Sequence, residues 1–129
     1  IDINNNGDMW RDFTYIDDIV EGVVRAADVI PKANPDWRVE SGSPATSSAP
    51  YAVYNIGHGS PINLMKFIEA IEAELGTEAN KNFREMQAGD VYKTYADTQD
   101  LFNATGYKAQ VGVEQGVSEL IKWYKSFYK

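Results

Sequence analysis

One stretch, Met9–Asp18, limits what this chain can fold into more than any other part. Its sequence, Met-Trp-Arg-Asp-Phe-Thr-Tyr-Ile-Asp-Asp, leads an apolar strand directly into the start of a helix. Asp17 is expected to cap this helix, and Asp18 and Glu21 place negative charge in its positive first turn. Apolar residues then repeat at helical spacing and predict that one helix face is buried: Ile19, Val20, Val23, Val24 and Ala27.

The segment before this stretch predicts a hairpin. Ile1–Ile3 alternates apolar and polar residues, and it is followed by three asparagines and Gly7. An Asn-Gly pair between two apolar runs is a strong short-range hairpin signal. We therefore expect residues 1–3 to pair with a returning strand at residues 10–16.

The rest of the chain alternates strand and helix patterns. After a long proline-containing loop at Pro31–Pro50, a short buried strand is expected at Tyr51–Ile56. A turn follows, in which Ser60 is expected to cap a helix that begins at Pro61 and ends at Gly76. Three further elements are predicted: a strand at Asn82–Met86, a helix from Asp97 or Thr98 to Gly106, and a helix at Val113–Tyr128 that buries Val117, Leu120, Ile121 and Tyr124.

This order of elements predicts an α/β fold with a small, largely parallel sheet and covering helices. Parallel strands joined by helices pack through right-handed crossovers. A chain of 129 residues is long enough for a core of its own. We therefore interpret residues 1–129 as one domain.

Composition disfavours several classes of function. The formal net charge of −7 argues against nucleic acid and membrane surfaces as partners, because both bind clusters of Lys and Arg. The chain has no cysteine and a single histidine, so disulfides, thiolate nucleophiles and metal sites are not expected. No apolar run is long enough to span a membrane and no signal peptide is recognisable, so a cytoplasmic location is expected.

Arg11 is the first candidate binding residue. It lies between two large aromatic residues, Trp10 and Phe13, and a guanidinium among apolar neighbours needs a partner. Its planar fork suits a phosphate or a carboxylate. The alternative is a structural ion pair with Asp12 or Asp17, because structural ion pairs commonly resemble sites. The residue pattern alone leaves both interpretations open.

Two turns are further candidates. Gly57–Pro61 resembles a glycine-rich phosphate turn, but it has no third glycine and its proline removes an amide, which favours a tight turn with a helix cap. Asp90 follows Ala88-Gly89 in a turn, where its carboxylate either accepts local amides or binds the hydroxyl groups of a sugar. The chain contains no G-x-G-x-x-G motif and no Tyr-x-x-x-Lys pair, so neither a dinucleotide site nor an acid–base pair for hydride transfer is expected in it.

Five strings together resemble one known family in order and spacing. They are Arg11–Gly22, Ser41–Tyr51, Val53–Gly57, Met86–Val91 and Tyr95–Asp97. They resemble the C-terminal part of extended short-chain dehydrogenase/reductase nucleotide-sugar epimerases. The second and fourth strings resemble the bacterial UDP-glucuronate 4-epimerases more narrowly, and the resemblance covers essentially the whole chain.

The resemblance implies a reaction for the parent enzyme. The family binds NAD on an N-terminal Rossmann domain, oxidises the sugar at C4 and returns the hydride to the opposite face of the 4-keto intermediate. Its catalytic and cofactor-binding residues lie upstream of the matching part, so the resemblance implies none of them here. The chain starts at Ile1 without a methionine, and it is interpreted as a fragment that is inactive and binds no NAD by itself.

The resemblance also implies three substrate-binding residues. Arg11 matches the family arginine that contacts the nucleotide diphosphate, and Asp90 matches the acid that binds the ribose hydroxyls. Gln87 falls where some relatives place a second phosphate-binding arginine. Asn4 and Tyr92 depart from the family pattern, in which an aromatic residue and a proline are more usual.

Three interpretations remain open at this point. The chain is the substrate-binding lobe of an epimerase that interconverts UDP-glucuronate and UDP-galacturonate, a stand-alone module that binds nucleotide sugars without catalysis, or part of a related sugar-nucleotide dehydratase or decarboxylase. All three imply a nucleotide sugar as the ligand, and the resemblance to the epimerases implies a UDP-sugar. A lobe without its Rossmann domain would expose apolar surface, so self-association is also expected.

Overall fold

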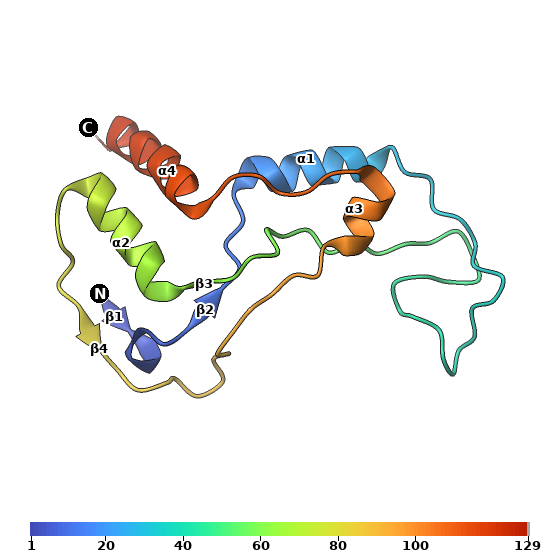
Figure 1. Cartoon of the computed structure of the whole chain (residues 1–129), viewed down its shortest axis with the longest axis horizontal. Helices are drawn as coiled ribbons and strands as arrows, with labels where there is room; N and C mark the ends of the chain where they lie inside the picture. Colours follow the sequence, from blue (N-terminus) through green and yellow to red (C-terminus); the bar gives the residue numbers. More distant parts are fainter. Residues whose placement is uncertain (129) are drawn as a thin grey trace.

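Two pairs of short strands join segments that are far apart in the sequence (Figure 1). The computed structural model describes residues 1–128. β1 (Asp2–Ile3) pairs in parallel with β4 (Asn82–Phe83), and β2 (Trp10–Arg11) pairs antiparallel with β3 (Ile62–Asn63). The fold is α/β with a small parallel sheet, as predicted.

The predicted N-terminal hairpin is wrong, because β1 and β2 each pair with a strand from much later in the chain. Between them, Asn4–Gly7 forms a 3-10 turn, η1. Asn5, Asn6 and Gly7 have positive φ values of 49°, 51° and 82°, a conformation that Asn and Gly tolerate better than other residues. The Asn-Gly signal therefore marks a real turn, but the strands on either side do not face each other.

Four helices accompany the strands: α1 (Ile16–Ala27), α2 (Leu64–Leu75), α3 (Gln99–Thr105) and α4 (Val113–Phe127). Gly76 and Gly106 end α2 and α3 in the left-handed conformation, each with a φ of 69°, as predicted. The Asp97 carboxylate accepts the amide of Gln99 at the start of α3. No helix within residues 1–128 is long and apolar enough to cross a membrane.

Two predicted helix starts are wrong. α2 begins at Leu64 rather than Pro61, because Ile62 and Asn63 pair with β2, and the Asn63 side chain then accepts the amide of Met65. α1 is preceded by Tyr15, so Asp17 lies inside the first turn and is not the cap. Asp17 still places its charge where the helix dipole favours it.

Two predicted strands also differ from the structure. Tyr51–Ile56 runs outside any ladder, and its contact with the preceding loop is a single bridge between Ala52 and Thr46. The strand expected at Asn82–Met86 is reduced to β4, because its parallel partner β1 is only two residues long.

The helices form two groups, and the small core lies within and between them. α2 packs against α4, and α1 packs against α3, while the loop between α1 and β3 extends away from both groups (Figure 1). The buried apolar side chains come from β1, from the residue before β2, from α2, α3 and α4, and from the residue that follows Gly106: Ile3, Met9, Ile68, Leu101, Tyr107, Val117 and Ile121. Val117 and Ile121 are thus buried as predicted, whereas Leu120 and Tyr124 are 46% and 48% exposed.

The predicted buried face of α1 is exposed. Its valines, Val20, Val23 and Val24, are between 52% and 55% exposed, and Ile16 is 60% exposed. α1 instead packs through Gly22, where an added Cβ would lie 3.1 Å from Ile56 Cγ2. A residue without a side chain lets the helix approach its neighbours closely, so the contact is made on this face and the valine face stays uncovered.

Candidate functional site

The side chains of Arg11 and Asp90 converge, although 79 positions separate them. Arg11 Nη2 donates to Asp90 Oδ1 over 2.9 Å, and the two side chains are 22% and 31% exposed. Both charged groups are thus partly reachable from solvent. The structure places the side chains of Arg11 and Asp90 in contact, and their role in binding a shared ligand stays a prediction.

Two backbone carbonyl groups hold the guanidinium in place. Arg11 Nη1 donates to Trp10 O over 2.9 Å and to Tyr92 O over 3.2 Å. Tyr92 O also accepts the amide of Trp10 over 3.0 Å, and the amide of Thr94 donates to Trp10 O over 3.1 Å. The segment that carries Asp90 therefore runs beside β2 through backbone hydrogen bonds, and this pairing fixes the distance between the two charged side chains.

Gln87 lies in the same turn as Asp90. The amide of Asp90 donates to Gln87 O over 3.1 Å, and Gly89 between them has a φ of 85°, which favours glycine. The Gln87 side chain accepts a hydrogen bond of 3.2 Å from Asn4 Nδ2. Asn4, Gln87, Asp90 and Arg11 therefore lie along one edge of the molecule, built from η1, β2 and the segment after β4.

Arg11 forms its ion pair with Asp90 and not with Asp12 or Asp17, the two partners considered from the sequence, and Asp12 accepts backbone amides instead. Asp12 Oδ2 accepts the amides of Gly59 and Ala96, each over 3.0 Å, and Asp12 Oδ1 accepts the amide of Ser60 over 3.2 Å. These three hydrogen bonds engage both oxygens of the Asp12 carboxylate. Asp12 therefore joins the end of β2 to two distant loops.

Backbone amides in the glycine turn at Gly57–Pro61 already donate hydrogen bonds to side chains of this chain. The amide of His58 donates to Thr14 Oγ1 over 3.1 Å, and the next two amides donate to Asp12. An added Cβ on Gly57 would lie 2.4 Å from Ala96 Cβ, so this glycine is required by close packing. The turn is a structural anchor, which agrees with the interpretation favoured from its sequence over a phosphate site.

Asp18 is a buried residue whose role the sequence did not reveal. Its side chain is 3% exposed, and Asp18 Oδ1 accepts the Tyr107 hydroxyl over 2.6 Å and the amide of Gln110 over 3.0 Å. Asp18 Oδ2 accepts the amide of Val111 over 2.9 Å. Sequence reasoning placed Asp18 in the first turn of a helix, but nothing in the local pattern pointed to partners some 90 positions later.

Burial and hydrogen bonding oppose each other at this carboxylate. Burial raises the pKa of Asp18, but the hydrogen bonds from Tyr107 and from the amides of Gln110 and Val111 outweigh it, so the pKa lies below its usual value. For Tyr107, burial and the hydrogen bond to Asp18 act in the same direction and raise its pKa to about 12. Asp18 is therefore charged and Tyr107 neutral at pH 7.

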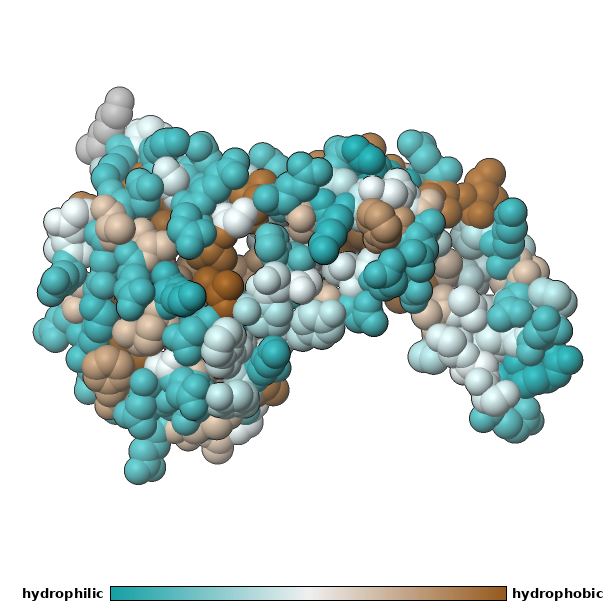
Figure 2. Space-filling model, viewed as in Figure 1, coloured by the Kyte–Doolittle hydropathy of each residue, from teal (hydrophilic) through white to brown (hydrophobic). Residues whose placement is uncertain are grey.

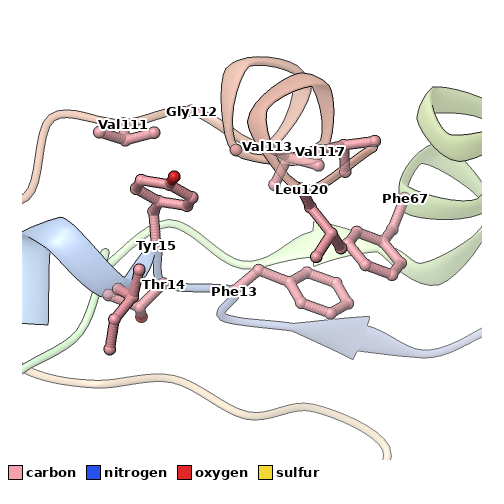
Figure 3. Close-up of a pocket in the computed structure, with 11 residues that line it drawn as sticks. Phe13, Thr14, Tyr15, Phe67, Val111, Gly112, Val113, Val117 and Leu120 are labelled. Atoms are coloured by element: carbon pink, nitrogen blue, oxygen red, sulfur yellow. The ribbon is translucent and has the colours of Figure 1, made fainter. Parts of the chain in front are cut away.

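A cavity with a mostly apolar lining lies beside the start of α1. It has a volume of about 310 Å³ and opens between the β2–α1 connection, α2 and α4 (Figure 3). Phe13 stacks on Phe67 at one side of it, with ring centroids 4.1 Å apart, and Leu120 lies above them. Figure 2 shows strongly apolar atoms in a hollow between the two groups of helices. The lining of this cavity is mostly apolar and includes no charged side chain.

A site for a metal ion does not form from the part of the chain that the structure describes. Within residues 1–128, no three His, Asp or Glu side chains come together in an arrangement that could hold one. Each buried polar side-chain atom in this range has a hydrogen-bond partner.

The chain is similar to known proteins over its whole length. No family model matches it. It is 52% identical over 129 residues to an uncharacterized 37.6 kDa protein of Escherichia coli O111:H-, and 42% identical over 130 residues to a probable UDP-glucuronate 4-epimerase of Rhizobium meliloti. These alignments cover 100% of this chain but 39% and 38% of the two relatives. The chain therefore spans about two fifths of the length of the curated relatives it matches.

A solved structure gives the same result. The UDP-glucuronic acid 4-epimerase of Bacillus cereus, in complex with UDP-glucuronic acid and NAD, superposes with a TM-score of 0.74 at 26% sequence identity. The superposition covers 98% of this chain and 35% of the epimerase. Over nearly its whole length, the chain is therefore similar in sequence and in fold to the C-terminal portion of nucleotide-sugar epimerases, among them UDP-glucuronate 4-epimerases.

Proposed function

We propose that the chain is the substrate-binding portion of an NAD-dependent epimerase that interconverts UDP-glucuronate and UDP-galacturonate through a 4-keto intermediate. One observation carries the proposal: the side chains of Arg11 and Asp90, which are 79 positions apart in the sequence, meet at 2.9 Å on an accessible edge. This pair matches what a nucleoside diphosphate needs, because a guanidinium binds phosphate oxygens and a carboxylate accepts hydrogen bonds from ribose hydroxyls.

Gln87 completes the proposed site. Its amide group lies in the turn that carries Asp90, and it donates and accepts hydrogen bonds without adding charge. In the proposed complex the diphosphate lies against Arg11, with Gln87 as a neutral second contact and Asp90 at the ribose. Relatives named as UDP-glucuronate 4-epimerases support the choice of sugar.

Residues 1–128 do not fit NAD. The one glycine-rich turn that resembles a dinucleotide loop already donates its amides to Asp12 and Thr14, so these amides are not available to a pyrophosphate. The chain also has no Tyr-x-x-x-Lys pair. We therefore assign NAD binding and hydride transfer to the remainder of the parent enzyme, and we expect the 129-residue chain to be inactive alone.

Titration of the 129-residue chain with UDP tests the binding role. We expect weak, millimolar binding that is lost in Arg11→Ala, because a partly exposed charge pair without the opposing wall of a closed site contributes little. Arg38→Ala, which removes the same charge from the long loop, serves as the matched control. UDP binding that is unchanged in Arg11→Ala would contradict the proposed site.

Two further measurements separate the alternatives. Micromolar binding of UDP by the isolated chain would favour a stand-alone binding module over a part of an enzyme. For the parent enzyme, conversion of UDP-glucuronate to UDP-galacturonate supports the epimerase, whereas release of water or CO₂ would identify a dehydratase or a decarboxylase.

A further inference from the structure

The guanidinium of Arg11 is almost fully used by the protein itself. A guanidinium has five N–H donors. Nη1 donates to Trp10 O and Tyr92 O, and Nη2 donates to Asp90 Oδ1 and faces Met9 Sδ at 4.0 Å. Four of the five donors are therefore directed at protein acceptors, and only one of those acceptors, Asp90, carries a charge.

An anion that binds Nη2 of Arg11 must compete with Asp90. The two carbonyl acceptors belong to the backbone pairing of β2 and stay in place, so among the donors that are already engaged Nη2 is the one that a phosphate oxygen can take over. While Asp90 keeps Nη2, its negative charge also repels the incoming anion. The pair is partly exposed, and such ion pairs contribute little to stability, so it can open.

We propose that Asp90 excludes bare anions from Arg11 and thereby makes this site selective for a diphosphate that is carried on a ribose. The inference rests on the proposed nucleotide-binding function and adds a specificity role to it. A ribose brings two hydroxyl donors, and these replace the guanidinium as partners of the carboxylate when phosphate takes Nη2. Free phosphate or pyrophosphate brings no such donors, so the Asp90 carboxylate would lose the hydrogen bond from Arg11 and gain none in its place.

The local geometry allows this exchange. The amide of Val91 donates to Asp90 Oδ1 over 2.8 Å, and the amide of Asp90 itself is bonded within its turn, so the residue keeps its anchor when Arg11 leaves. Its side chain is 31% exposed, which leaves the carboxylate accessible to a ligand. The carboxylate thus has one partner that holds it and one partner that can be exchanged.

NMR titrations of the 129-residue chain at constant ionic strength test the proposal with two probes, inorganic pyrophosphate and UDP. We expect Asp90→Asn to bind pyrophosphate about fivefold more tightly than the unchanged chain, the factor that corresponds to a partly exposed ion pair. The same variant is expected to bind UDP more weakly, so the preference for UDP over pyrophosphate falls. Asparagine keeps an oxygen for the Val91 amide, and Asp90→Ala provides a second variant.

Two controls locate the effect. Asp8→Asn removes the same charge nearby, since Asp8 Oδ1 accepts the Tyr92 hydroxyl over 3.0 Å, and it is expected to shift both affinities equally. Arg11→Ala combined with Asp90→Asn is expected to lose the gained pyrophosphate affinity.

The outcomes distinguish this inference from the proposed function. Pyrophosphate affinity that stays unchanged, decreases or remains undetectable in Asp90→Asn would overturn the exclusion of bare anions by Asp90. Tighter pyrophosphate binding in Asp90→Asn, together with no UDP binding by the unchanged chain, would support that exclusion while contradicting the nucleotide site.

Discussion

The carboxylate of Asp18 accepts a hydrogen bond of 2.6 Å from the hydroxyl of Tyr107, which lies 89 positions later in the chain. Both side chains are buried, and the bond joins the first turn of α1 to the segment between α3 and α4. The amides of Gln110 and Val111 donate to the same carboxylate. The segment between α3 and α4 has no regular structure of its own, and these hydrogen bonds to Asp18 attach it to α1.

Removal of the Tyr107 hydroxyl is expected to destabilise the fold. Tyr107→Phe leaves the buried Asp18 with one donor fewer, which should lower the free energy of unfolding by about 2 kcal/mol. Urea denaturation followed by circular dichroism measures the change. Tyr124→Phe, which removes a hydroxyl from a half-exposed ring on α4, is the matched control. Equal unfolding midpoints for the two variants would contradict a structural role for the hydrogen bond.

The Asp18 carboxylate should make stability depend on pH on the acid side. Its pKa in the folded chain lies below the usual value of 3.8, so it stabilises the fold above that pH. This contribution is lost as the pH falls through the lowered pKa. Urea denaturation over this range should therefore show a shallower acid decline for Asp18→Asn than for the unchanged chain, and parallel curves would contradict the assignment.

Tyr107 should make the stability of the fold depend on pH on the alkaline side as well. Burial and the bond to Asp18 raise its pKa from 10.0 to about 12, so its neutral form stabilises the fold below pH 10. That contribution disappears as the pH rises from 10 toward 12. The unchanged chain is expected to lose more stability across this interval than Tyr107→Phe, which has no ionisable group there. An identical alkaline loss in the two proteins would show that Tyr107 is not responsible.

Asp12 should matter more for folding than its charged neighbours. Asp12→Ala leaves the amides of Gly59, Ser60 and Ala96 without their acceptor, and we expect the free energy of unfolding to fall by about 3 kcal/mol. Asp17→Ala, which removes an exposed carboxylate from α1, should change it far less. Hydrogen exchange of the three amides gives a local readout, and unchanged exchange rates in Asp12→Ala would refute this role.

The exposed valine face of α1 should drive self-association of the 129-residue chain. Val20, Val23 and Val24 lie uncovered on one side of the helix, and contiguous apolar surface of this kind marks an interaction site. Sedimentation velocity is expected to show association that increases with concentration and is suppressed by Val20→Lys combined with Val24→Lys. Val39→Lys, at a valine that is 80% exposed in the long loop, should have no effect. A single monomeric species at all concentrations would contradict this prediction.

Local signals in the sequence predicted the helices better than the strands. Gly76 and Gly106 end their helices because a left-handed residue is needed there, and that requirement is visible in the sequence itself. The strands depend on partners far away: β1 pairs with residues 82–83, and β2 pairs with residues 62–63. Two-residue strands carry too few side chains to encode such a register, so the Asn-Gly signal suggested a hairpin that does not form.

The candidate site shows the same division. The convergence of Arg11 and Asp90 followed from a resemblance that supplied long-range information, and the structure places the two side chains in contact. The sequence contained no information on the hydrogen bond between Asp18 and Tyr107, because an aspartate in a first helical turn is explained equally well by the helix dipole. Asp18 could act as a charge at the helix dipole or as a buried hydrogen-bond acceptor. Only the packing of α1 through Gly22, which turns Asp18 inward, distinguishes these two roles.

The adjacency of Arg11 and Asp12 has a practical consequence. Consecutive residues of an extended chain project to opposite sides, so one peptide unit separates the partly exposed guanidinium of Arg11 from the carboxylate that anchors two loops. Arg11 can therefore be varied to test the proposed site while the framework stays intact. The position next to it offers no such freedom, because Asp12 carries the hydrogen bonds that anchor both loops.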